Sequence, residues 1–197
     1  MSSFVPAPTT DQVLLARAAA GDLEAFGVIY GRYHHVVYRF ARGMTGAGDA
    51  AEDVAHDAFL ALLDDASRFD PRRASLTTYL YGIVRNLCRQ RLRRQSRLQP
   101  LALDVAEPSV SDDDPLAEAQ MARLVRRALA TLPSRYRELV LLCDLHDLSY
   151  AEAAQVTGTS VPAVRSRLHR GRQRLKAALA AQLAVRLPAF KAARWAV

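Results

Sequence analysis

The chain has 197 residues, of which 50% are hydrophobic and 24% charged, a composition typical of a folded protein with one domain or two small ones. Its net charge of +7 comes almost wholly from arginine, because Lys176 and Lys191 are the only lysines, and it favours a polyanionic partner. The two cysteines, Cys88 and Cys143, give neither a disulfide framework nor a four-ligand zinc site. No signal peptide or membrane span is recognisable, so we expect a cytoplasmic protein without membrane insertion.

Apolar residues recur at helical spacing through the first half, and no segment is typical of a strand. Residues 1–10 are expected to be disordered. Thr9 with Gln12 and then Gly21 bracket a short helix, and Asp22 begins a longer helix that ends near Gly43. Two more helices are predicted from the cap signals that follow, which are Asp49 with Glu52 and, after the turn Phe69-Asp70-Pro71, Ser75.

A flexible acidic linker is predicted next, over residues 98–114. Residues 98–122 contain no lysine or arginine and are interrupted by prolines, while carboxylates accumulate at Asp104, Glu107, Asp112, Asp113, Asp114 and Glu118. Asp114 followed by Pro115 predicts that a helix restarts there. The linker therefore separates a first domain, residues 11–97, from a second, residues 115–182, and residues 183–197 form a tail with no assigned role.

Four helices are also predicted in the second domain, over residues 115–131, 134–144 and 149–157 and from residue 160 to beyond 180. The predicted fold class is thus all-α, with two small helical domains. Ser149 with Glu152 forms a capping box, Gly158 supplies a left-handed residue, and Ser160 caps the last helix. These signals predict a helix-turn-helix.

The last helix has an outer crest suited to the major groove of DNA. Val164, Leu168, Gly171 and Leu175 form its inward stripe. The opposite side, which we call the outer crest, consists of Ser166, His169 and Gln173 with Arg165 and Arg170 on its shoulders, and Arg167 lies nearer the flank. Such a crest can read base edges while guanidinium groups hold phosphates. A plain solvated basic face would be the better interpretation without the capped helix ahead of it.

Six arginines lie between Arg85 and Arg97, on the helix that begins near Ser75. Its apolar stripe is expected to be buried, and the opposite side is predicted to present Thr78, Gly82, Arg85, Asn86, Arg89 and Arg93. With Tyr79 and Tyr81 on its shoulders and the loop of residues 68–74 ahead of it, this surface can hold single-stranded nucleic acid. Each tyrosine taken alone is more often half-buried packing.

The helix near Asp49 carries an acidic stripe, which consists of Asp49, Glu52, Asp53 and His56 with Asp57 adjacent. Its inward face is Ala51, Val54, Ala55, Ala58 and Leu62. DNA would repel the stripe, so any partner should be a basic protein surface. Taken alone, it would be interpreted as a solvated helix face.

In this order the motifs resemble the extracytoplasmic-function (ECF) group of RNA polymerase sigma factors over residues 11–97 and 116–180. Ala51-Glu52-Asp53-Val54 resembles the polymerase-binding helix of sigma region two, and Arg68-Phe69-Asp70 through Arg85-Asn86 resembles its promoter-melting loop and minus-10 helix. Leu132-Pro133-Ser134-Arg135-Tyr136-Arg137-Glu138, Leu148-Ser149-Tyr150-Ala151-Glu152 and Val164 to Arg172 resemble region four. Asp147 stands where the family commonly has glycine.

The resemblance implies a sigma factor that binds core polymerase and directs promoter-specific initiation. The acidic stripe, Asp49, Glu52, Asp53, His56 and Asp57, would contact the β′ clamp helices, and the implied partners also include the β flap, promoter DNA and an anti-sigma factor. Implied minus-10 contacts are Arg68, Phe69, Asp70, Arg72, Ser75, Tyr79, Arg85, Asn86 and Arg89. Implied minus-35 contacts are Ser160, Arg165, Ser166, Arg167, His169, Arg170 and Gln173.

Two other classes of protein fit parts of the sequence. One is a helix-turn-helix regulator that is not a polymerase subunit, which would bind duplex DNA tightly by itself and would not need the acidic stripe. The other is a metal-dependent enzyme, because His34-His35 and the run from Cys143 to Asp147 contain ligand types. Adjacent histidines on a helix point about 100° apart, and no nucleophile with its base is present, so we expect no cofactor, no metal and no enzymatic activity.

Overall fold

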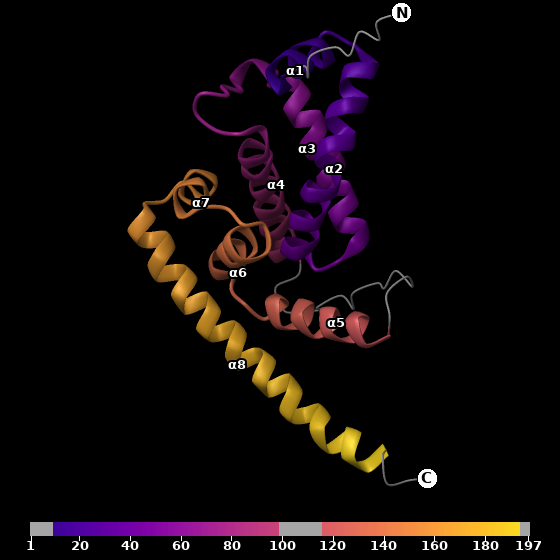
Figure 1. The fold of residues 1–197 in the computed structure, drawn as a ribbon, viewed down its shortest axis with the longest axis vertical. Coiled ribbons are helices and arrows are strands. Elements are labelled where there is room, and N and C mark those ends of the chain that lie inside the picture. The colour runs from indigo at the N-terminus through magenta and orange to yellow at the C-terminus, as the bar shows by residue number, and fades with distance from the viewer. Residues whose placement is uncertain (1–9, 99–115, 194–197) are drawn as a thin grey trace, which may run out of the picture.

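The computed structural model describes residues 10–98 and 116–193, and within these ranges it contains helices and no strand. The N-terminal module contains α1 (Asp11–Ala19), α2 (Leu23–Thr45), α3 (Gly48–Asp64), a 3₁₀ turn η1 (Ala66–Arg68) and α4 (Leu76–Leu98). The C-terminal module contains α5 (Leu116–Ala130), α6 (Ser134–Val140), a π-helical turn η2 (Leu141–Leu145), α7 (Tyr150–Thr157) and α8 (Val161–Ala193) (Figure 1). The all-α prediction is confirmed. Most of the predicted linker and the two chain ends lie outside the described residues.

Most predicted helix ends have the expected chemistry. The side chain of Asp22 accepts hydrogen bonds from the backbone N–H groups of Glu24 and Ala25, both at 3.1 Å. Ser149 and Glu152 form both halves of the capping box. Gly158 ends α7 with a φ of 63°, a left-handed conformation that glycine adopts without a Cβ penalty.

Two predicted caps are wrong. Helix α3 begins at Gly48 after Ala47, so Asp49 lies in its first turn, where a carboxylate still interacts favourably with the helix dipole. Helix α1 has Thr10 at its N-cap position, and the side chain of Thr10 makes no capping hydrogen bond. Thr9 lies outside the described residues.

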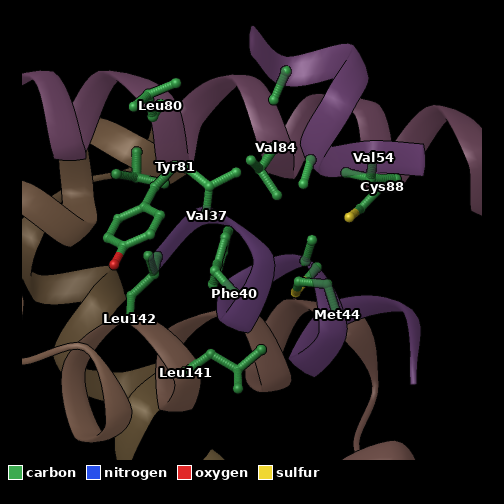
Figure 2. Packing of buried hydrophobic residues seen from close by; sticks show 14 of the residues in the cluster. Val37, Phe40, Met44, Val54, Leu80, Tyr81, Val84, Cys88, Leu141 and Leu142 are labelled. Atoms are coloured by element: carbon green, nitrogen blue, oxygen red, sulfur yellow. The ribbon is translucent and has the colours of Figure 1, made fainter. Parts of the chain in front are cut away.

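The core of the N-terminal module is formed by the faces that the helical spacing predicts. Ala51, Val54, Ala55, Ala58 and Leu62 of α3 are all buried, as are Leu76, Leu80 and Val84 of α4. Val37, Phe40 and Met44 of α2 belong to the same buried cluster (Figure 2). Burying a leucine, valine or phenylalanine side chain contributes about 1.5–3 kcal/mol, so this cluster holds the three long helices together.

In the C-terminal module α8 packs closely on α6. Val164 and Leu168 are almost completely buried, as the inward stripe predicts. A Cβ at Gly171 would lie 3.0 Å from Cγ2 of Val140 and 3.4 Å from the backbone oxygen of Tyr136. The absence of a side chain at Gly171 therefore lets the two helices approach, which fixes the direction in which α8 presents its outer crest.

The predicted regular helix over residues 134–144 is only half correct. After Val140 the chain widens into the π-helical turn η2, which is rare in proteins and often occurs at functional sites. Asp147 then adopts a φ of 55°, where L-residues other than asparagine and aspartate are uncommon. Asp147 therefore has a backbone conformation that glycine adopts without a Cβ penalty.

The two modules are packed against each other instead of lying apart on a connector. Helix α4 contacts α7, and α2 contacts α5, α6 and η2. A single buried cluster runs through both modules and includes Phe40 and Tyr81 from one, and Leu141 and Leu142 from the other (Figure 2). No helix in the described part of the chain is long and apolar enough to cross a membrane.

Candidate nucleic-acid and protein-binding surfaces

The outer crest of α8 faces solvent. Ser166, His169, Arg170, Gln173 and Arg165 are exposed, as is Ser160 at the start of the helix, while Arg167 is half-buried. Nε2 of Gln173 lies 2.9 Å from Nε2 of His169, so these two side chains hold each other on one face. The guanidinium of Arg165 lies 5.8 Å from the centre of the Tyr150 ring. The crest thus offers donors and acceptors to a groove, with positive charge at its side.

One arginine of α8 is paired with a carboxylate of its own module. The guanidinium of Arg172 makes hydrogen bonds with the carboxylate of Asp144, at 2.5–3.2 Å. This pair raises the pKa of Arg172, and it ties α8 to the π-helical turn. Arg172 therefore has a structural partner within its own module.

A pocket of about 300 Å³ lies beside the loop that precedes α4. Its lining consists of Arg68, Phe69, Asp70, Arg73, Ala74 and Tyr79, together with Gln155 from α7. The ring centroids of Phe69 and Tyr79 lie 5.6 Å apart, which gives the pocket an aromatic wall. A hollow with an aromatic wall and arginines at its rim suits a base that has left the duplex.

The rest of this loop is fixed by short-range hydrogen bonds. Nε and Nη2 of Arg72 donate to the two carboxylate oxygens of Asp70, each at 3.0 Å. These bonds from Arg72 are the main reason that the pKa of Asp70 is lowered. Oγ of Ser75 accepts from the backbone N–H of Thr78 at 3.2 Å and so caps α4, while its own residue stays exposed.

Two residues that the helical wheel of α4 predicts to be exposed are buried. Asn86, Arg89 and Arg93 are exposed, but Thr78 and Arg85 are 4% and 8% exposed. Nε of Arg85 donates to Oε2 of Glu138 at 2.7 Å, across the contact between the modules. The prediction that Arg85 faces solvent is therefore wrong for this conformation, because α4 has a neighbour on both sides.

The acidic stripe on α3 does face solvent. Asp49, Glu52, Asp53, His56 and Asp57 are all exposed. Nη1 of Arg91 lies 3.2 Å from a carboxylate oxygen of Asp53, and Nε2 of His34 lies 3.5 Å from one of Glu52. The two carboxylates are exposed while Arg91 and His34 are half-buried, and such surface pairs contribute little to stability, so the carboxylates can exchange these partners for a basic protein surface.

The ligand types noted for a metal enzyme do not form a site. Within residues 10–98 and 116–193 no three His, Cys, Asp or Glu side chains lie close enough to hold a metal ion. Burial raises the pKa of the Cys88 thiol to about 12 and that of Cys143 to about 11, so neither sulfur is an activated nucleophile.

Three residues that matter to the arrangement were not predicted from the sequence: Glu138, His146 and Gln155. Each contacts the other module, through Arg85, Tyr81 and the backbone of Arg73 respectively. Of these three residues, only Glu138 could have been singled out from the sequence. A carboxylate inside a helix of a small domain needs a cation as its partner if it is buried.

Comparisons with known proteins match both modules of the chain. Residues 29–98 match the family model for Sigma-70 region 2, and residues 122–175 match that for Sigma-70, region 4. The ECF RNA polymerase sigma factor SigM of Mycobacterium tuberculosis is 34% identical over 168 residues, covering 84% of this chain and 83% of that protein.

Two solved structures are also similar. CnrH in complex with the cytosolic domain of CnrY is 31% identical, with a TM-score of 0.62 over 87% of this chain and 97% of that one. The sigma factor RpoE in complex with the anti-sigma factor NepR from Bartonella quintana is 24% identical, with a TM-score of 0.67 over 78% and 96% of the two chains. At 24% identity, the similarity to RpoE concerns the fold alone.

These findings define the class of protein as a bacterial transcription initiation factor that directs RNA polymerase to promoters. The chain belongs to the sigma-70 family and, within it, to the ECF sigma factors. Members of this family are initiation factors that carry out no catalysis themselves, so the prediction of a non-enzyme is confirmed and the isolated DNA-binding regulator is not favoured.

Proposed function

We propose that this sigma factor uses three separate surfaces, one for core polymerase and two for promoter DNA. The observation that carries the proposal is the separation of charge. A row of exposed carboxylates lies on α3, whereas the exposed arginines and polar residues of the outer crest lie on α8. DNA attracts the second surface and repels the first, so a single partner does not suit both.

The acidic stripe on α3 docks on the basic β′ clamp helices of core polymerase, and the C-terminal module reaches the β flap. The N-terminal module, residues 11–97, then places the pocket beside Tyr79 against the non-template strand of the minus-10 element. Arg68, Arg72 and Arg89 are exposed there and can hold phosphates, while Phe69, Asp70, Ser75 and Asn86 surround the extruded base. Arg85 joins this group once it is freed from Glu138.

The outer crest of α8 reads the minus-35 element in the major groove. His169 and Gln173 already share one face through their 2.9 Å contact, and Arg170 and Ser166 lie exposed beside them. Each specific contact from such a side chain is worth about 1–3 kcal/mol of discrimination against the wrong base. The protein works in the cytoplasm, where a sequence-specific anti-sigma factor masks its polymerase-binding faces. CnrH and the Bartonella RpoE were each solved with a protein partner, in the second case an anti-sigma factor.

The test separates docking on polymerase from promoter reading. Asp53→Ala is expected to weaken the affinity for core polymerase by about 1 kcal/mol, because it removes one carboxylate from the stripe. Arg170→Ala should leave core affinity unchanged and weaken minus-35-dependent run-off transcription from genomic fragments about tenfold. Core affinity is measured by fluorescence anisotropy of the labelled protein.

Matched controls lie on the same two helices. Asp64→Ala removes an exposed carboxylate at the end of α3, outside the stripe, and Lys176→Ala removes an exposed charge from α8, outside the crest. Both should behave as the wild-type protein. Equal loss of core affinity in Asp53→Ala and Arg170→Ala would contradict the separate assignments, and no protein-dependent transcript from any fragment would reject the role.

A further inference from the structure

Helix α8 carries basic side chains and no acidic one. No aspartate or glutamate follows Glu152 in the chain, so a carboxylate that neutralises an arginine of α8 must come from another element. Arg172 has such a partner, because it is paired with Asp144 of η2. Among the side chains that the structure describes, no carboxylate pairs with the other arginines of α8, which are Arg165, Arg167, Arg170 and Arg174.

The pair between Arg172 and Asp144 uses two nitrogens of the guanidinium. Nε of Arg172 lies 3.2 Å from Oδ1 and 3.1 Å from Oδ2 of Asp144, and Nη2 lies 2.5 Å from Oδ1. These bonds are the largest cause of the raised pKa of Arg172, burial acts in the opposite direction, and the side chain of Tyr150 adds to the rise. A guanidinium grips a phosphate through the same donors, so the carboxylate occupies the groups that DNA would use.

Arg172 lies on the edge of the outer crest that also carries Arg165. The two residues are seven positions apart, so their side chains leave the helix within about 20° of each other and about 10 Å apart along its axis. Tyr150 of α7 lies beside both, with its ring centre 5.8 Å from the Arg165 guanidinium and its side chain hydrogen-bonded to Arg172. When α8 lies in a major groove, this edge faces one phosphate backbone, and Asp144 reduces its positive charge from two to one.

The fold of the C-terminal module does not require this pair. The side chains of Arg172 and Asp144 are 53% and 28% exposed, and ion pairs at the surface contribute little to stability. Buried Val164 and Leu168, with the close approach at Gly171, already hold α8 on α6. The main effect of the Asp144 carboxylate is therefore on the charge that α8 presents.

We propose that Asp144 limits sequence-independent DNA binding by this sigma factor, because it neutralises Arg172 at the edge of the outer crest. The proposal rests on the minus-35 role given to α8 above. Each phosphate that a protein neutralises steepens the dependence of log affinity on log salt by about 0.9 and strengthens binding to every sequence alike. With one such contact fewer, binding to the promoter depends more on the base contacts of the crest.

The experiment compares Asp144→Asn with its matched control Asp147→Asn. Fluorescence anisotropy measures the affinity of the full-length protein for a labelled duplex DNA of random sequence at several salt concentrations. Asp144→Asn should bind about fivefold more tightly than wild type near 0.1 M salt, with a salt dependence steeper by about 0.9.

The control removes the same charge three residues away. Asp147 is exposed, pairs with no arginine among the described side chains, and has a φ of 55° that asparagine also adopts. Salt screens the effect of its charge on a distant phosphate, so Asp147→Asn should stay within about twofold of wild type.

A double-mutant cycle shows whether the carboxylate acts through Arg172. Arg172→Gln alone should bind the random duplex as wild type does, and it should abolish the gain of Asp144→Asn in affinity and in salt dependence. Asp144→Ala repeats the test with a different replacement, and circular dichroism checks the helices of each variant. The proposal is overturned if neither Asp144 variant binds more tightly than Asp147→Asn, or if the gain persists with Arg172→Gln.

Run-off transcription with core polymerase tests the minus-35 role of α8 separately. If Arg170→Ala weakens minus-35-dependent initiation but the Asp144 variants gain no affinity, only the proposal for Asp144 fails. If Arg170→Ala leaves initiation unchanged, the minus-35 role fails, whatever the affinity of the Asp144 variants for the random duplex.

Discussion

Acidification should loosen the contact between the modules, because His146 is held neutral there. Nδ1 of His146 lies 2.9 Å from the hydroxyl oxygen of Tyr81, and the Phe40 ring packs edge-on at a centroid distance of 5.8 Å. Burial, and then the positive charge of Arg39, lower the pKa of His146 from 6.5 to about 4, while the carboxylate of Asp147 acts in the opposite direction. The folded pKa is therefore below that of a histidine in solvent.

The direction of the pH effect follows from this difference. Between pH 6.5 and about 4 the open or unfolded chain binds more protons than the closed one, so closure is favoured at neutral pH and weakens as the pH falls. From pH 7 to pH 5 a full shift would be worth about 2 kcal/mol, which partial exposure of the ring reduces to about 1 kcal/mol. The carboxylates of Asp22, Asp70 and Glu152 act at more acidic pH, because their pKa values are lowered from ordinary values of 3.8, 3.8 and 4.5.

An NMR titration of the His146 ring protons checks the prediction directly, with the signal assigned by its loss in His146→Gln. The expected midpoint is about 4. Tyr81→Phe should keep the midpoint low, because burial is the largest cause of the lowered pKa and the charge of Arg39 is the next. A wild-type midpoint near 6.5 would refute the reasoning, because it would place the ring in water rather than between the two modules.

Two further outcomes are expected. Gly158→Ala should lower the free energy of unfolding by about 1 kcal/mol in denaturant titrations, because the φ of 63° strains a residue with a Cβ while nothing lies within 4 Å of that atom. An unchanged midpoint and slope would show that α7 ends differently in solution. Cys88, whose pKa burial raises to about 12, should resist Ellman's reagent at pH 8 in the native protein because its thiol is buried and protonated, and it should react once denaturation exposes it. Rapid native labelling at Cys88 would contradict its burial.

Local chemistry explains how much of the fold could be predicted. The caps at Asp22 and Ser149 and the left-handed Gly158 depend on residues a few positions apart, so a single sequence is enough to find them. The inward faces of α3 and of α8 near Val164 and Leu168 were likewise predicted, because helical periodicity decides which side of an amphipathic helix is buried. The exposed acidic stripe of α3 and the outer crest of α8 lie on the sides of these helices opposite the buried faces.

The contact between modules could not be predicted in this way. The helical wheel of α4 assumes one buried side, whereas Val84 packs within its own module and Arg85 packs against Glu138, which is 53 residues away. Thr78 is likewise buried, within hydrogen-bond distance of Ser75 at the start of α4. The π-helical turn that places Leu141 and His146 also has no local signature in the sequence.

The seam between Gly43 and Leu141 limits how freely parts of such proteins can be recombined. A C-terminal module transplanted from another sigma factor brings its own side chain opposite Gly43 and its own residue opposite Arg85. A bulkier residue opposite Gly43 would clash with α2, and an uncharged residue opposite Arg85 would leave its buried charge without a partner, even when both halves fold correctly. Hybrid proteins joined at the linker should therefore be stable only where the two halves match at this contact.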